Sequence, residues 1–164
     1  MKIVDYANKR PSTSDGLKVG GHQASSSSIV TIMTSLYFDF MQSGDLISIK
    51  PHGSPVFHAI QYLLGNLPRK YLTTLRGYQG LQAYPSRVRD PDSVDFSTGS
   101  VGLGSVAPNF AAQVGEYLKT HFQMNDLKDH RYISVLGDAE LDEGSIWEAI
   151  AEPSMVDIHN VLWI

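Results

Sequence analysis

The chain contains no cysteine among its 164 residues. This excludes disulfides, thiolate nucleophiles and thiolate-bound zinc, so any bound metal must take oxygen or imidazole ligands. The sequence has no run of about eighteen apolar residues. It also has no charged-then-apolar leader after Met1. We therefore expect neither a membrane span nor a secretory signal, and the predicted location is the cytoplasm.

Positive charge is scarce and scattered along the chain. Lys and Arg number 13 against 17 Asp and Glu, which gives a formal net charge of -4. Without a basic cluster there is no electrostatic footprint for nucleic acid or for an anionic membrane. The apolar fraction of 42% lets a chain of this length bury a core of its own. A folded protein with a small-molecule partner is the expectation.

Apolar residues recur at helical spacing in some segments and form short runs in others. The pattern predicts strands over 46–49, 95–98, 132–136 and 161–164 and helices over 25–40, 54–65, from about Gly104 to His121, and 145–151, the last stopped by Pro153. Residues 1–21 are predicted to be an irregular arm and 77–91 a surface loop. The alternation of strand and helix predicts an α/β domain over 22–164, with a mostly parallel sheet and helices on both faces.

An acidic turn follows the apolar run at 132–136. It reads Gly137-Asp138-Ala139-Glu140-Leu141-Asp142-Glu143-Gly144 and precedes a helical segment. A carboxylate at the end of a strand, flanked by small residues, can bind magnesium while nearby amides face a phosphate. The alternative is a solvated turn whose acidic residues favour the start of the next helix. If the turn binds a ligand, the pattern indicates a diphosphate cofactor with its metal.

Three histidines lie beside glycine or proline near predicted element ends. His22 and His52 fall where α/β folds build their ligand crevices. For His58, inside the helix predicted over 54–65, a hydrogen-bonded structural role is favoured. The segment 102–107 matches G-x-G-x-x-A, but no acidic strand end follows it, so a nicotinamide cofactor is disfavoured.

Four segments, read together and in order, resemble the cofactor-binding N-terminal region of the thiamine-diphosphate-dependent transketolase superfamily. They are Gly20-Gly21-His22-Gln23-Ala24-Ser25, Lys50-Pro51-His52-Gly53-Ser54-Pro55, Phe96-Ser97-Thr98-Gly99-Ser100-Val101-Gly102-Leu103-Gly104 and Gly137-Asp138-Ala139-Glu140. The first three, with Ala83-Tyr84-Pro85, look most like the homodimeric decarboxylase component of bacterial pyruvate dehydrogenase. The later segment Trp147-Glu148-Ala149 looks more like transketolase.

The resemblance implies a role for each matching residue. Asp138 would bind the magnesium that bridges the diphosphate, with the backbone of Gly137, Ala139 and Glu140 at the phosphates. Ser100, Val101 and Gly102 would lie near the cofactor rings and Ser25 near the substrate. His22 and His52 would line the channel as catalytic groups, since imidazoles can protonate or orient an oxyanion.

Three departures from the family pattern matter. Ala139 replaces the usual second glycine of Gly-Asp-Gly, and Lys50-Pro51 replaces a Gln or Asn followed by Gly. The family's metal-binding Asn lies past Ile164, and its catalytic glutamate comes from a second, pyrimidine-binding domain across a dimer interface. The chain is therefore expected to be a truncated, incomplete cofactor-binding domain that needs a second domain or chain.

The leading hypothesis is the diphosphate- and magnesium-binding part of a 2-oxo acid (pyruvate) dehydrogenase decarboxylase component. The alternative in the same chemistry is transketolase, which moves a two-carbon ketol unit between sugar phosphates. Transketolase would need basic residues at the channel mouth, for which Arg76, Arg87 and Arg89 are candidates, although solvated loop charges are the favoured interpretation of these arginines. A catalytically silent binding or structural module is a further alternative, because fold alone does not fix function.

Overall fold

A computed structural model describes residues 2–11, 20–124, 130–152 and 156–164. The chain divides into two compact units. The helical unit comprises Met1–Met41 and Pro51–Val94, and the sheet unit comprises Gln42–Lys50 and Asp95–Ile164. The assignment of 22–164 as one cofactor-binding domain stays a prediction.

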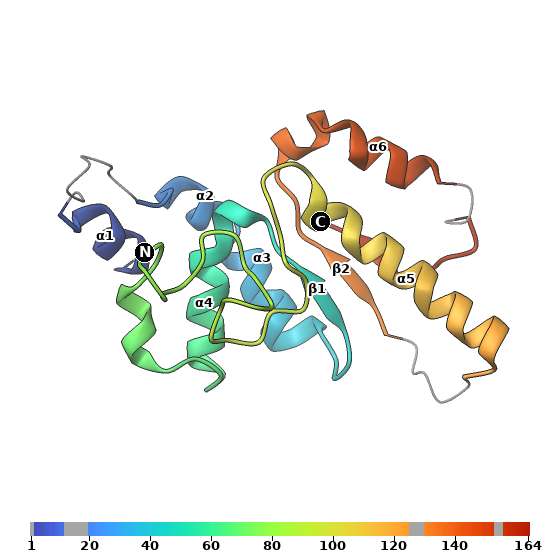
Figure 1. Ribbon diagram of the computed structural model, residues 1–164, viewed down its shortest axis with the longest axis horizontal. Helices are drawn as coiled ribbons and strands as arrows, with labels where there is room; N and C mark the ends of the chain where they lie inside the picture. The colour runs from blue at the N-terminus through green and yellow to red at the C-terminus, as the bar shows by residue number, and fades with distance from the viewer. Residues whose placement is uncertain (1, 12–19, 125–129, 153–155) are drawn as a thin grey trace. The chain divides into compact units, whose positions relative to one another are not determined.

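The helical unit contains seven elements among its described residues. They are α1 (Lys2–Lys9), α2 (Gln23–Ser28), α3 (Val30–Ser35), the π-helix η1 (Leu36–Phe40), the 3-10 turn η2 (Pro51–Gly53), α4 (Ser54–Leu63) and the 3-10 turn η3 (Arg69–Thr73). The helix predicted over 25–40 is present but interrupted at Ile29, where φ is -107° and ψ is 1°. The helix predicted over 54–65 is confirmed as α4 (Figure 1). Pro55 lies in its first turn.

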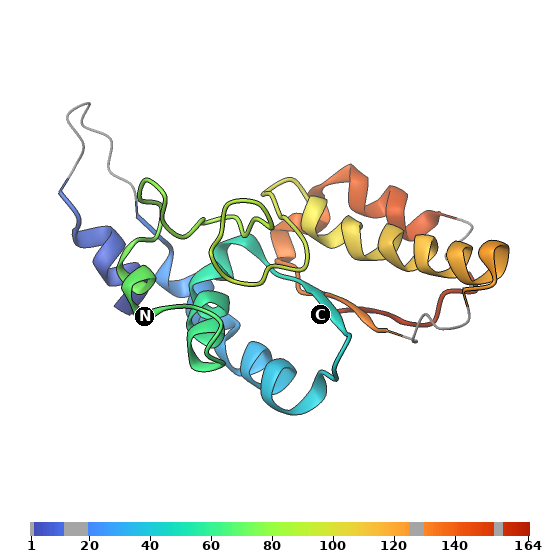
Figure 2. The same ribbon diagram turned by 60° about the horizontal axis from the view of Figure 1, so that its bottom comes forward.

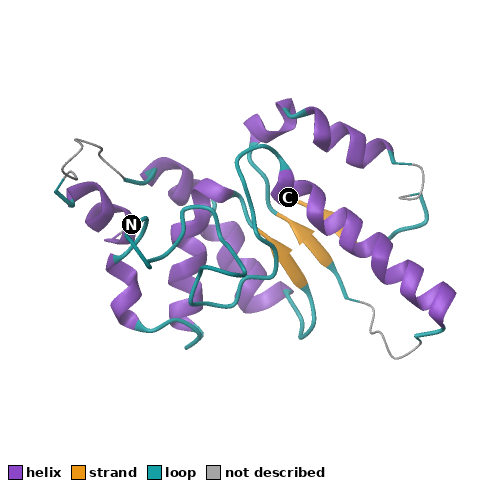
Figure 3. Ribbon diagram, viewed as in Figure 1, coloured by secondary structure: helices purple, strands orange, loops and turns teal. Residues whose placement is uncertain are grey.

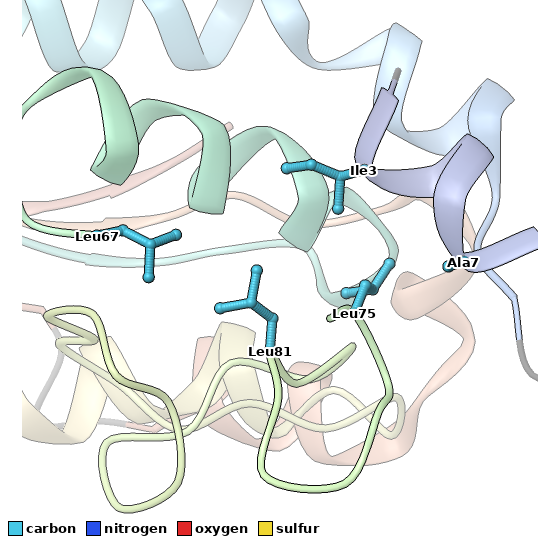
Figure 4. Close-up of a cluster of buried hydrophobic side chains, with 5 residues drawn as sticks. All are labelled: Ile3, Ala7, Leu67, Leu75 and Leu81. Carbon is cyan, nitrogen blue, oxygen red and sulfur yellow. The ribbon is translucent and has the colours of Figure 1, made fainter. Parts of the chain in front are cut away.

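Helix α1 corrects the prediction of an irregular arm. Ile3, Val4 and Ala7 share one face and are buried. Ile3 and Ala7 pack with Leu67, Leu75 and Leu81 in one apolar cluster (Figure 4). The helix has only eight residues and is polar on average, so it depends on tertiary packing for its stability.

The sheet unit contains β1 (Leu46–Ser48), α5 (Leu103–Phe122), β2 (Tyr132–Ser134), the 3-10 turn η4 (Asp138–Asp142), α6 (Gly144–Ala151) and β3 (Val161–Trp163). The strands form a parallel sheet in the order β1-β2-β3 (Figure 3). Helix α5 packs along all three strands, and α6 packs on α5 (Figure 2). The predicted α/β class with a parallel sheet is confirmed. Pro153, the predicted end of the last helix, lies outside the described residues.

The strand predicted over 95–98 is wrong, because this segment is irregular. The Asp95 side chain accepts a hydrogen bond from the backbone N–H of Ile47 in β1, at 2.9 Å. A side chain thus satisfies an N–H that β2 leaves unpaired, as buried backbone groups require. None of the helices in the described ranges is both long and apolar enough to cross a membrane.

An ion pair ties the start of β1 to the start of β2. The Arg131 guanidinium donates from Nε to Oδ2 of Asp45 at 2.9 Å, and the Arg131 backbone N–H donates to Oδ1 at 3.1 Å. Burial alone would raise the pKa of Asp45, but hydrogen bonds from Arg131 and from the Gln42 N–H outweigh it and hold the pKa below its ordinary value. Carboxylate charge therefore stabilises the strand pairing.

We predict that Asp45→Asn lowers the free energy of unfolding at pH 7 by about 1.5–3 kcal/mol, the typical value of hydrogen bonds to charged groups. Because the pKa of Asp45 is lowered in the folded state, its ionised carboxylate stabilises the fold at pH values above the unfolded-state pKa of about 3.9. This stabilisation is lost as the pH falls through the folded-state pKa. Denaturant unfolding should show the difference between variant and wild type shrinking below about pH 4. Asp5→Asn, in an exposed pair with Lys9, is the control. A pH-independent loss would contradict this account.

Candidate functional site

The helical unit contains a pocket of about 260 Å³. His22 and His52 both line it, with ring centroids 5.0 Å apart and an edge-on interplanar angle of 73°. The Tyr84 ring lies 6.3 Å from that of His52. The structure thus brings the two predicted channel histidines together. The pocket is lined by Gly20, Gly21, His22, Pro51, His52, Ser54, Pro55, Leu75, Arg76, Ala83 and Tyr84.

Helix α1 positions the glycines that precede His22. The Asn8 side chain accepts the Gly21 N–H at 2.8 Å and donates to the Gly21 carbonyl at 3.2 Å. The Arg76 guanidinium donates to the Gly20 carbonyl at 2.9 Å. A Cβ on Gly20 would lie 2.1 Å from Oδ1 of Asn8, so a side chain there would displace the Asn8 side chain from its hydrogen bonds with Gly21. Sequence reasoning missed Asn8, whose only signal was the apolar spacing of α1.

His52 sits in η2, one turn before α4. A Cβ on the next residue, Gly53, would lie 2.1 Å from Cδ1 of Ile29, so a side chain there would displace Ile29, the residue that joins α2 and α3. Ser25 is half-buried in α2, about one turn after His22, and is not among the residues that line the pocket. Its predicted place near a substrate stays a prediction.

His58 in α4 is fully buried and belongs to a different cluster. Its Nδ1 lies 2.7 Å from Oδ2 of Asp92, and its Nε2 lies 3.0 Å from the Gln82 carbonyl. Both ring nitrogens lie within hydrogen-bonding distance of an oxygen atom, so the imidazole is fully engaged inside the protein. The structural interpretation of His58 is confirmed, and this buried pair with Asp92 fastens the loop at 82–92 to α4.

His58, Asp90 and Asp92 offer donor atoms within 4.8 Å of one another, a set compatible with a metal ion. However, the Asp90 carboxylate already accepts the backbone N–H groups of Gln82 at 2.7 Å and Ser86 at 2.8 Å. Burial raises the pKa of Asp90, while these hydrogen bonds and the charge of His58 oppose the rise. With both His58 nitrogens also engaged, the cluster is better described as a hydrogen-bonded ion pair.

In the sheet unit, the acidic turn leaves the carboxyl end of β2 as η4. Gly137 is buried, while Asp138 and Ala139 are exposed. Oε2 of Glu140 accepts the Gly137 N–H at 2.7 Å. Burial raises the pKa of Glu140, and the hydrogen bond from Gly137 and the charge of Lys50 partly offset the rise. Asp138 therefore remains accessible at the strand end, while Glu140 organises the turn.

The loop before α5 lies against the segment that follows the acidic turn. Gly102 has a φ of 78°, and a Cβ there would lie 3.1 Å from Ile146 Cγ1 and 3.2 Å from Glu143 Cβ. Ser100 and Val101 are exposed just before it. Within the sheet unit, the segment that ends at Gly102 thus lies against residues 143–146, which follow the predicted cofactor-binding residues Gly137–Glu140 in the sequence.

The residues present fit a diphosphate with magnesium. Asp138 offers an exposed carboxylate oxygen, the ligand type that magnesium prefers. The Lys50 ammonium lies 3.5 Å from the position that a Cβ on Gly137 would occupy. A cationic group therefore lies beside the turn. A carboxylate for the metal and an ammonium for phosphate oxygens form a suitable donor set.

No family model matches the chain. Its curated relatives are enzymes of the thiamine-diphosphate-dependent transketolase superfamily, and the chain is their homologue, as its four motifs predict. It is 30% identical over 157 residues to the pyruvate dehydrogenase E1 component of Escherichia coli (strain K12), covering 90% of this chain and 18% of that protein.

Two further relatives belong to the transketolase side of the superfamily. The 6-deoxy-6-sulfo-D-fructose transketolase subunit SqwG of Clostridium sp. (strain MSTE9) is 34% identical over 139 residues, or 79% of this chain and 48% of that protein. The transketolase of Pongo abelii is 31% identical over 155 residues, or 88% of this chain and 23% of that protein. The chain therefore spans less than half the length of each of these relatives.

We predict that His58→Leu lowers the free energy of unfolding by about 3–5 kcal/mol, because it leaves Asp92 buried without its partner. The double variant with Asp92→Leu should recover part of this loss. Thermal unfolding with and without a chelator separates the ion pair from a metal site. The ion pair predicts an unchanged wild-type midpoint in the chelator, whereas a fall as large as that of His58→Leu would establish a metal.

Proposed function

We propose that this chain forms the diphosphate- and magnesium-binding part of a thiamine-diphosphate-dependent enzyme that decarboxylates a 2-oxo acid, as a pyruvate dehydrogenase-like component. The observation that supports it most is the turn at the end of β2, with exposed Asp138 beside buried Gly137. The adjacent loop that ends at Gly102 supports the same ligand. We also propose a cytoplasmic location.

In this proposal each part of the site has one task. Asp138 holds the magnesium, and the backbone of Gly137, Ala139 and Glu140 faces the phosphates. Ser100, Val101 and Gly102 approach the rings of the cofactor. When bound, the cofactor supplies a nucleophilic carbon that attacks a ketone carbonyl, so that the adjacent carbon–carbon bond can break.

The two pocket histidines are proposed to donate protons and to stabilise negative charge on a substrate oxygen. With ring centroids 5.0 Å apart, His22 and His52 can address the same small substrate. A neutral or protonated imidazole can donate to an oxygen that gains negative charge when a carbonyl is attacked. Ser25 is proposed to contact the substrate from α2. These roles make His22 and His52 the catalytic residues of the helical unit.

Arg76 supports an anionic substrate. It lines the pocket, whereas Arg87 and Arg89 do not. Its Nη1 donates to the Gly20 carbonyl, and its exposed guanidinium can still pair with a carboxylate or a phosphate. A 2-oxo acid presents the first group, and a ketose phosphate presents the second. Transketolase therefore remains the second candidate, and turnover with pyruvate against xylulose 5-phosphate decides between them.

The complete enzyme needs more than this chain supplies. The chain spans 18% of the pyruvate dehydrogenase relative and 48% of the transketolase subunit. We propose that residues outside the given sequence contribute the remaining metal ligand, and that a second, pyrimidine-binding domain or chain contributes the catalytic glutamate. A homodimer is the proposed form of the complete enzyme.

We predict that Asp138→Asn weakens thiamine diphosphate binding at least tenfold in magnesium and removes most of the effect of the metal, because a neutral amide loses the charged interaction. Calorimetric titration of the natively assembled enzyme with the cofactor, with and without magnesium, measures this. Asp142→Asn changes an exposed carboxylate of the same turn and is the matched control. Unchanged affinity and metal dependence in Asp138→Asn would refute the assignment.

A further inference from the structure

Lys50 lies where β1 and β2 leave the sheet together. It follows Ser48, the last residue of β1, by two positions, and Ser48 pairs with Ser134 at the end of β2. The backbone N–H of Val135 donates to the Ser48 carbonyl at 2.9 Å, which keeps the two segments side by side beyond the strands. Lys50 and the turn that begins at Gly137 therefore emerge from the same edge of the sheet.

The end of the Lys50 side chain lies beside Gly137. A Cβ built on Gly137 would lie 3.1 Å from Cε and 3.5 Å from Nζ of Lys50. Oε2 of Glu140 would lie 3.4 Å from the same point. The absence of a side chain at Gly137 thus makes room for the lysine head. The ammonium is held beside the backbone of the turn.

The charge of Lys50 is only partly compensated within the protein. Lys50 is half-buried, and in the part of the chain that the structure describes no carboxylate makes a direct ion pair with it. The nearby Glu140 carboxylate is engaged elsewhere, since its Oε2 accepts the Gly137 N–H at 2.7 Å. A half-buried ammonium without a direct counter-ion is costly, and an arriving anion would offset that cost.

The chemistry of the site selects phosphate oxygens as this anion. An ammonium has three donors and no acceptor, so it cannot ligate a metal ion. Two cations that share one turn repel each other unless an anion lies between them. The exposed Asp138 carboxylate suits a divalent metal, and the Lys50 ammonium suits the oxygens of a diphosphate that the metal also binds.

We propose that Lys50 binds the diphosphate of the cofactor directly and gives the Gly137–Glu140 turn a fixed positive charge that does not depend on the metal. This inference rests on the proposed function. It adds Lys50 to the cofactor-binding residues, from the Lys50-Pro51 segment in which this chain departs from the family pattern. Part of the affinity for diphosphate therefore persists when magnesium is removed.

Calorimetric titration of the natively assembled enzyme tests this, with thiamine diphosphate and, separately, inorganic pyrophosphate as probes. Each titration is run in magnesium and in a chelator. Lys50→Met keeps most of the side-chain length and removes the charge, and Lys50→Arg keeps the charge. Lys2→Met removes a lysine charge from the exposed face of α1 and is the matched control.

Lys50→Met is expected to weaken the binding of both probes roughly tenfold to a hundredfold, as for the loss of a hydrogen bond to a charged group. The loss should persist in the chelator, Lys50→Arg should restore most of the affinity, and thermal unfolding should be unchanged. If wild type binds the cofactor and Lys50→Met binds it equally well, the role of Lys50 is refuted while the proposed function stands. If wild type binds neither probe even with magnesium, the proposed function fails first.

Discussion

The parallel pairing of β1 with β2 is the constraint on which the proposed site depends. Ser48 and Ser134 are partners in this pairing, so the segments that follow both strands leave the sheet at one edge. The Asp45–Arg131 ion pair fixes the opposite ends of the same two strands. The acidic turn acquires Lys50 as a neighbour only because this register is kept. A change of register would separate the turn from the ammonium.

Close backbone approach is the second constraint, and glycine makes it possible in both units. Gly20 and Gly53 let the histidine segments pack tightly against Asn8 and Ile29 in the helical unit. In the sheet unit, Gly137 makes room for Lys50, and Gly102 takes a positive φ at the start of α5. The motif glycines thus let side chains of neighbouring segments approach the backbone closely, which positions the functional segments.

Much of this could be predicted from the sequence where the signal was local. The helical spacing of α4 and α5, the short apolar strands and the four ordered motifs indicated a parallel α/β fold of this superfamily. The His22–His52 pair was also anticipated, and the structure places both rings in one pocket. The structural interpretation of His58 is confirmed by its two hydrogen bonds.

The predictions that were wrong concern segments whose structure depends on contacts with residues far away in the sequence. Helix α1 has only eight residues, and Leu75 and Leu81, against which it is buried, lie far along the chain. Asp95 looked like the start of a strand, but its side chain satisfies the Ile47 N–H instead. The roles of Asn8 and Lys50 were not predicted, because their partners lie elsewhere in the chain. Gly21 is 13 residues from Asn8, and Gly137 follows a different strand from the one that precedes Lys50.

Hydrogen exchange with and without thiamine diphosphate and magnesium tests the central claim most directly, because it reports where the cofactor acts along the chain. The account predicts slower exchange of backbone amides at 100–104 and 137–143 in the natively assembled enzyme. Amides of η3, at Arg69–Thr73, should exchange unchanged. Exchange that slows elsewhere while 137–143 is unaffected would contradict the assignment of this turn as the diphosphate and magnesium site.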